Sequence, residues 1–84
     1  MGPSVPLTVY STPWCGYCTR LKRQMKQAGL TYIEVDIESD PESERFVRAV
    51  NGGSATVPVV ALPSGRALSN PSIAQVLEAL GTAA

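Results

Sequence analysis

The sequence contains no histidine and no long hydrophobic segment, and each absence excludes a class of function. Without histidine the protein has no Cys–His nucleophile pair and lacks a common partner of cysteine in zinc sites, so we expect no bound metal. No apolar stretch is long enough to cross a bilayer, so we expect no membrane contact. The formal net charge is zero, which does not favour nucleic acid or an anionic surface as a partner.

Eighty-four residues are too few to bury two hydrophobic cores, so we expect one domain over residues 1–84. Residues 1–14 show no basic start followed by a long apolar stretch, and Pro6 stands where a myristoylation motif needs serine or threonine. These features predict a cytoplasmic protein. In that compartment a closely spaced cysteine pair indicates redox or metal chemistry rather than a structural disulfide.

The charged residues are concentrated in two consecutive segments of the chain. The first segment carries four basic residues, and the second carries six of the seven acidic residues. The basic residues are Arg20, Lys22, Arg23 and Lys26, and the acidic residues are Glu34, Asp36, Glu38, Asp40, Glu42 and Glu44. They form either two solvated surfaces or a dipolar surface that orients a charged partner.

Hydrophobic periodicity and turn signals predict seven elements in the order β-α-β-α-β-β-α. The predicted strands are residues 5–10, 33–37, 56–62 and 66–68, and the predicted helices begin near Gly16, Pro41 and Pro71. The helices end at Gly29, at Asn51–Ser54 and at Gly81, and Asp40 and Asn70 are the predicted N-caps of the second and third helices. The charged face of the second strand is typical of a sheet edge.

Apolar side chains recur on one face of the predicted elements, and this recurrence predicts the core. The inward-facing residues are Cys18, Leu21, Met25, Ala28, Ile33, Val35, Ile37, Phe46, Val47, Val50, Ile73, Val76, Leu77 and Leu80. The strand–helix–strand opening implies parallel pairing through a right-handed crossover, and the later strands form an antiparallel hairpin. We therefore predict an α/β fold, a mixed four-stranded sheet flanked by three helices that cover both faces.

The only two cysteines lie three residues apart, in Trp14-Cys15-Gly16-Tyr17-Cys18, where a strand passes into a helix. A thiolate at Cys15 would lie at the positive end of the helix dipole and accept from the N–H groups of Tyr17 and Cys18, which favours the anion. Cys18 follows one turn later on the same face, near enough to attack a mixed disulfide on Cys15. The pattern predicts Cys15 as the nucleophile and Cys18 as the resolving thiol, with no tightly bound cofactor.

Two other interpretations of the cysteine pair stay open. In the first, the cysteines are inert core residues. In the second, two chains share an iron–sulfur cluster through four sulfurs in total. A mononuclear zinc site is less favoured, because the chain offers only two soft ligands.

Four further residues, Val57, Pro58, Trp14 and Tyr17, are candidates for a binding groove. If the Val57–Pro58 peptide is cis, the backbone of Val57 is free to pair with the main chain of a cysteine-containing substrate, although an edge-strand proline without a role is an equal alternative. Trp14 and Tyr17 flank the nucleophile. They are either wall residues of a shallow groove or, for Trp14, partly core.

The order of these features resembles the glutaredoxin family of the thioredoxin fold over essentially the whole chain. The similar motifs are Trp-Cys-x-x-Cys, Thr56-Val57-Pro58 and the closing hairpin and helix. The resemblance implies that Pro58 is cis and faces the active site, that the strand order is 2-1-3-4, and that Thr56 and Val57 contact the substrate.

Two regions depart from the glutaredoxins that use glutathione. No basic residue precedes Trp14, and Ser69-Asn70-Pro71-Ser72 contains no acid. These departures resemble the mycoredoxins, actinobacterial glutaredoxin-like enzymes whose thiol, mycothiol, is an N-acetylcysteine on a sugar–inositol and carries no carboxylate or free α-amine. The resemblance implies that Ser69 and Asn70 line a pocket without charged clamps.

The same resemblance implies a monomeric thiol–disulfide oxidoreductase that reduces mycothiolated proteins. Mycothiol is then the co-substrate, and NADPH acts only through a separate mycothiol disulfide reductase. The alternatives are a generic glutaredoxin and a ribonucleotide-reductase-linked redoxin. The latter is expected to carry an aromatic-rich segment before its last helix, and residues 68–72 contain no aromatic residue.

Overall fold

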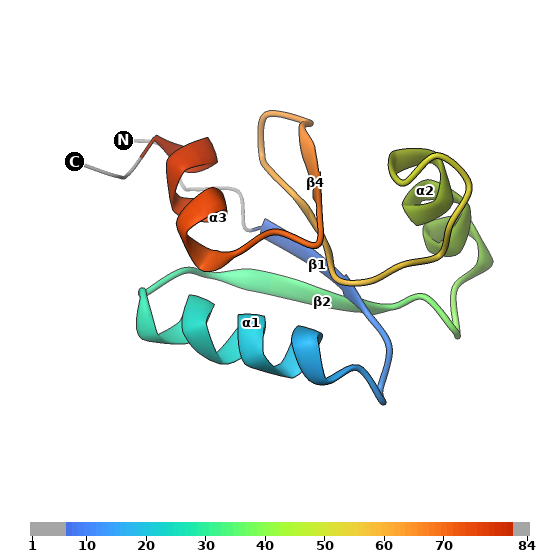
Figure 1. Ribbon diagram of the computed structural model, residues 1–84, viewed down its shortest axis with the longest axis horizontal. Coiled ribbons are helices and arrows are strands. Elements are labelled where there is room, and N and C mark those ends of the chain that lie inside the picture. Colours follow the sequence, from blue (N-terminus) through green and yellow to red (C-terminus); the bar gives the residue numbers. More distant parts are fainter. Residues whose placement is uncertain (1–6, 82–84) are drawn as a thin grey trace.

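A computed structural model describes residues 7–81 and contains the seven elements in the predicted order (Figure 1). They are β1 (Leu7–Ser11), α1 (Gly16–Gln27), β2 (Tyr32–Asp36), α2 (Pro41–Val50), β3 (Val59–Ala61), β4 (Ala67–Ser69) and α3 (Ile73–Leu80). Val5 and Pro6 of the first predicted strand lie outside the described residues, as do the N-terminal positions considered for myristoylation.

The four strands form one mixed sheet in the order β2-β1-β3-β4, which confirms the predicted fold. β1 pairs in parallel with β2, from Leu7 opposite Tyr32 to Ser11 opposite Asp36. β3 pairs antiparallel with both β1 and β4. Because β1 and β2 are parallel, their carboxyl ends meet at one edge of the sheet, and the segments that follow them become neighbours.

The core is divided by the sheet into two clusters, because consecutive strand residues face opposite sides. Val60 packs in one cluster with Val9 and the inner faces of α1 and α3, whereas Val59 packs with Ile37 and Val47 on the side of α2. Figure 1 shows α2 well apart from α1 and α3. Each fully buried side chain of this size contributes about 1.5–3 kcal/mol to the folded state.

Three predicted core residues, Ala28, Ile33 and Phe46, are more exposed than their pattern indicates. Ile33 is 54% exposed. Figure 1 places α2 beside the end of β2 and away from its start, so Ile33 has no helix above it while Ile37 is buried. Phe46 is also partly exposed, and its ring packs against Tyr10 with centroids 5.1 Å apart.

The predicted starts of the third strand and of the last helix shift, whereas the predicted N-cap Asp40 is confirmed. The third strand begins at Val59 rather than at residue 56, because Pro58 precedes it and has no N–H for the ladder. Asn70 does not cap the last helix; its φ of 47° is left-handed, and Ser72 is the N-cap. Asp40 does precede α2, but its carboxylate accepts from the Ser43 hydroxyl instead of a backbone N–H.

The helices are short. The longest, α1, has 12 residues, whereas a bilayer crossing needs about 20. Within residues 7–81, no helix combines the length and the hydropathy needed to cross a membrane.

Candidate active site

Cys15 is the N-cap residue of α1, and its sulfur takes the place of the usual capping oxygen. Cys15 Sγ accepts a hydrogen bond from the Cys18 N–H at 3.1 Å. The described residues show no such bond from the Tyr17 N–H, so one of the two predicted donors is present. The first turn of α1 contains no acidic side chain, so no carboxylate offsets the helix dipole at this sulfur.

Cys18 lies in the helix interior in a different environment. Its side chain is 0% exposed, whereas Cys15 is 7% exposed. Burial, with a hydrogen bond to Cys15 as the second cause, raises the pKa of the Cys18 thiol from 9.0 to about 12. Cys18 is therefore a protonated thiol at neutral pH. It lies one helical turn from Cys15 Sγ, which accepts a hydrogen bond from the backbone.

The Val57–Pro58 peptide is cis, as the family resemblance implies. The Val57 carbonyl oxygen lies 4.0 Å from Cys15 Sγ, and Pro58 is fully buried beside it. The Pro58 carbonyl accepts from the Asn70 N–H at 2.8 Å, which ties the end of β4 to the start of β3. The fold thus brings Val57 to Cys15 and joins Asn70 to the neighbouring Pro58.

Two surface depressions flank the start of α1. The first has a volume of about 360 Å³ and contains Cys15. It is lined by Trp14, Cys15, Gly16, Tyr17, Ala55, Thr56 and Val57. The second, of about 510 Å³, lies between α1 and the start of α3, and its lining includes Tyr17, Arg20, Pro58 and Asn70. Tyr17 belongs to both, so it forms the ridge between them. We call them the Cys15 depression and the Asn70 depression.

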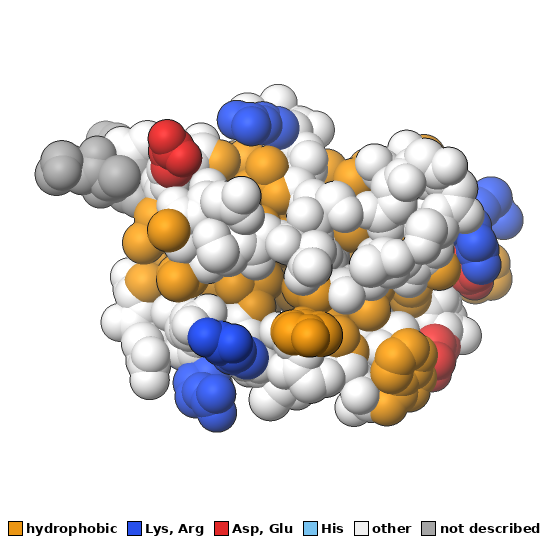
Figure 2. Space-filling model, in the orientation of Figure 1, with side chains coloured by type: hydrophobic (Ala, Val, Ile, Leu, Met, Phe, Trp, Pro, Cys, Tyr) orange, Lys and Arg blue, Asp and Glu red, His pale blue; other side chains and the backbone are white. Residues whose placement is uncertain are grey.

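Trp14 and Tyr17 are both largely exposed, and the core alternative for Trp14 is therefore wrong. Figure 2 shows hydrophobic side chains standing on the surface over the start of α1. Trp14 Nε1–H donates to the Glu38 carboxylate at 2.6 Å. Glu38 was not among the predicted site residues.

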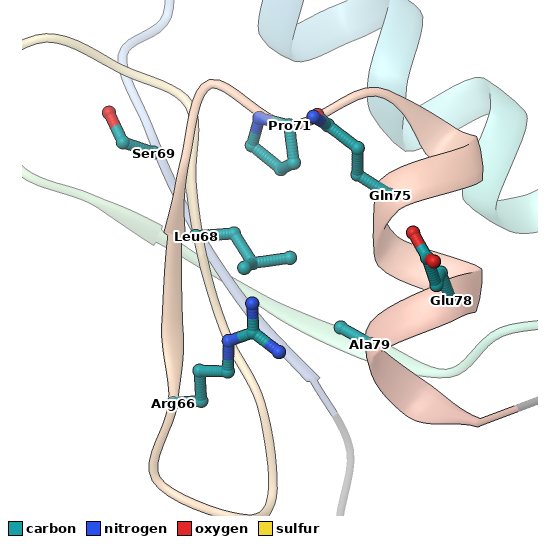
Figure 3. A pocket seen from close by; sticks show the side chains of 7 residues that line it. All are labelled: Arg66, Leu68, Ser69, Pro71, Gln75, Glu78 and Ala79. Carbon is teal, nitrogen blue, oxygen red and sulfur yellow. The ribbon is translucent and has the colours of Figure 1, made fainter.

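Ser69 does not reach either depression. It lines a separate pocket of about 410 Å³ between β4 and α3, where its side chain points away from Leu68 and Pro71 (Figure 3). Its hydroxyl donates to the Asn51 side-chain oxygen, and the Asn51 amide donates to the Thr56 carbonyl at 2.8 Å. Ser69 therefore supports the loop that carries Thr56 and does not itself face the cysteines.

The prediction of a site with only neutral partners is incomplete, because the structure adds two charges. Arg20 lines the Asn70 depression, and its position three residues after Tyr17 places both on one face of α1. Glu38 follows β2 as Trp14 follows β1, so parallel pairing brings the two together. Both residues were detectable in principle, the first from helical spacing and the second from the predicted strand pairing.

Both cysteines are free thiols. Within residues 7–81, no three or more histidine, cysteine or acidic side chains are grouped to hold a metal ion. A shared iron–sulfur cluster would need the two sulfurs of a second chain. The geometry of one chain suits thiol–disulfide exchange: a backbone-stabilised sulfur at a surface depression, with a buried thiol behind it.

Comparisons with known proteins give the same fold and chemistry. Residues 7–64 match the family described as glutaredoxin. A Mycobacterium tuberculosis protein named as a glutaredoxin is 49% identical over 70 residues, which cover 83% of each chain. Mycoredoxin 1 of Corynebacterium glutamicum is 35% identical over 71 residues, covering 84% of this chain and 87% of that protein. The glutaredoxin structure from Archaeoglobus fulgidus has a TM-score of 0.74 at 20% identity, covering 94% and 88% of the two chains.

Proposed function

Because this chain belongs to the glutaredoxin family and is a thiol–disulfide oxidoreductase, we propose that it reduces mixed disulfides between proteins and mycothiol. The observation that carries the chemistry is Cys15 at the start of α1, bonded by the Cys18 N–H. The choice of thiol rests on the similarity to mycoredoxin 1. Residues 1–84 then act as one domain and one monomer in the cytoplasm.

The first step is attack by the Cys15 thiolate on the mycothiol sulfur of the mixed disulfide. A bond forms between Cys15 Sγ and mycothiol, the original S–S bond breaks, and the protein cysteine leaves as a thiolate that takes up a proton. The uncharged lining of the Cys15 depression accommodates the small thiol. Val57, on the opposite wall, offers backbone groups to the substrate main chain.

The second step restores the enzyme. The thiolate of a second mycothiol attacks the mycothiol sulfur bound to Cys15, so that mycothiol disulfide forms and the Cys15 thiolate is released. A separate NADPH-dependent reductase then reduces the mycothiol disulfide. The protein itself therefore needs no tightly bound cofactor.

Cys18 offers a side path in which it attacks Cys15 Sγ, releases mycothiol and forms an internal disulfide. This path requires that Cys18 loses a proton, and burial, the largest cause of its raised pKa, disfavours the thiolate at neutral pH. The main route is therefore the monothiol route through Cys15.

Glutathione is a weaker fit to the Cys15 depression, because it would bring two carboxylates and an ammonium to a lining without charged side chains. Hydrogen bonds to charged groups contribute about 1.5–3 kcal/mol each, and groups that lose water without such a bond oppose binding. One observation favours glutathione instead. Arg20 lines the Asn70 depression and can pair with a carboxylate, so a generic glutaredoxin is the second candidate.

The deciding experiment compares one peptide carried as two mixed disulfides, one with mycothiol and one with glutathione. Turnover is followed by NADPH oxidation through the matching disulfide reductase. We expect kcat/KM to favour mycothiol by at least about tenfold, which corresponds to roughly 1.4 kcal/mol. Equal values for the two substrates would overturn the mycothiol assignment and favour the generic glutaredoxin.

A further inference from the structure

Trp14 is held in place although most of its surface is exposed. The side chain is 73% exposed, and the 2.6 Å hydrogen bond from Nε1 to Glu38 fixes one edge of the indole. An exposed aromatic ring costs hydrophobic free energy unless a ligand covers it. The hydrogen bond preorganises the ring as a flat surface beside the nucleophile.

A small third depression adjoins Trp14 and does not include Cys15 in its lining. It has a volume of about 210 Å³ and is lined by Thr12, Trp14, Ile37, Glu38, Glu44 and Ala55. It shares Trp14 and Ala55 with the Cys15 depression. A ligand bonded through its sulfur to Cys15 can therefore continue across Trp14 into this third space, which we call the Glu38 depression.

The polar groups of the Glu38 depression mainly accept hydrogen bonds. Its lining contains two carboxylates and no basic side chain. Arg48 neutralises Glu44 through an ion pair at 2.9 Å, but the described residues place no basic partner on Glu38. Thr12 lies beneath with 6% exposure, and its hydroxyl oxygen has no hydrogen-bond partner in residues 7–81.

This chemistry selects one kind of ligand. Hydroxyl groups donate well to a carboxylate, and the faces of a sugar or cyclitol ring pack against an indole. A carboxylate of the ligand at the same place would be repelled by Glu38, and no basic side chain lines the depression to pair with it. The depression therefore suits a hydroxyl-rich, uncharged ligand and disfavours an acidic one.

We propose that the Glu38 depression is a subsite for the polyhydroxylated sugar–cyclitol end of the small thiol, with Glu38 as its specificity-determining residue. The proposal rests on the proposed function, because mycothiol carries such an end. Glu38 then acts twice: it accepts ligand hydroxyls, and it orients Trp14 as the surface on which the ring lies.

The kinetic test replaces Glu38 and measures kcat/KM with mycothiol and glutathione mixed disulfides of one peptide. Glu38→Lys should lower the value for mycothiol about tenfold and raise it for glutathione severalfold. Glu38→Gln keeps a hydrogen-bond acceptor for Trp14, so kcat/KM with the mycothiol substrate should fall less than it does in Glu38→Lys. Glu42→Lys is the matched control, since Glu42 lies in the exposed first turn of α2 and outside the depression, and both values should stay unchanged.

A binding test separates the subsite from the reaction. Trp14 is the single tryptophan, so its fluorescence reports this position alone. The probe is the N-acetylglucosaminyl–inositol that lacks the cysteine. We expect a saturable fluorescence change in the wild type and in Glu42→Lys, and none in Glu38→Lys.

The outcomes distinguish the two proposals. If the wild type prefers mycothiol and Glu38→Lys keeps the same preference, the subsite is wrong while the proposed function stands. If the wild type shows no preference, the proposed function is wrong. In that case the binding test decides on the subsite. Saturable binding of the sugar–inositol probe to the wild type but not to Glu38→Lys would still support the subsite. No binding to the wild type would overturn it.

Discussion

Helices α1 and α3 begin with the same hydrogen-bond geometry on different atoms. Cys15 Sγ accepts from the Cys18 N–H at 3.1 Å, and Ser72 Oγ accepts from the Gln75 N–H at 3.1 Å. In both cases the donor is the third residue of the helix, and neither first turn contains an acid. The electrostatic environment of an N-cap is thus common to a structural and a reactive position.

The two helix starts differ in the side chain of the residue whose backbone N–H donates to the N-cap. Gln75 reaches back with its side chain and accepts from the Ser72 N–H at 2.8 Å, which closes a capping box. Cys18 points into the core instead and keeps its proton. The start of α3 is closed by two reciprocal hydrogen bonds. The start of α1 leaves Cys15 Sγ at a surface depression, with the Cys18 thiol behind it.

Replacing the capping sulfur by oxygen should produce the largest effect. In Cys15→Ser the hydroxyl caps α1 as Ser72 caps α3, so the free energy of unfolding should change by less than about 0.5 kcal/mol. Exchange activity should fall at least about a thousandfold, because the nucleophile is lost. Urea denaturation and NADPH-coupled turnover measure the two quantities, and an unstable variant would contradict the cap comparison.

The buried thiol should show its altered pKa in the Cys15→Ser background. Burial, the largest cause of the raised pKa, persists in this variant, while the two causes that involve the Cys15 sulfur are removed, so the Cys18 pKa should still lie above 9.0 in the native protein. Iodoacetamide labelling read by mass spectrometry should level off above about pH 9 in urea. In the native protein it should still rise above pH 9. A native plateau near pH 9 would show that burial does not control this thiol.

Removing the capping box tests its contribution to the stability of the start of α3. Ser72→Ala removes the side-chain acceptor for the Gln75 N–H and should lower the free energy of unfolding by about 1 kcal/mol. Ser64→Ala is the control, because that hydroxyl accepts only a 3.4 Å bond in an exposed turn. Equal losses in the two variants would argue against a specific cap.

The smallest effect is expected for Cys18→Ser. If the monothiol route dominates, turnover of small mixed disulfides should stay within about threefold of the wild type, while the internal disulfide can no longer form. NADPH-coupled turnover measures the first, and a thiol count after oxidation measures the second. A loss as large as that of Cys15→Ser would mean that both cysteines are obligatory.

Local patterns in the sequence were sufficient for the element order, the mixed sheet and the position of Cys15 at a helix start. These features depend on neighbours within a few residues: alternation in β1, helical spacing in α1, and Gly81, which ends α3 with a left-handed φ of 74°. The nucleophile and resolving thiol were assigned from the same local spacing, because an N-cap and the third helical residue always lie close together.

Only the tertiary structure decided which distant residues surround that pair. Ser69 carries a suitable side chain but turns to Asn51, whereas Glu38 lies against Trp14 because β1 and β2 end at the same edge. Ile33 has a core pattern and stays exposed because α2 lies beside the end of β2 and away from its start. Such outcomes depend on the lengths and directions of elements that are far apart in the chain, and no local pattern records them.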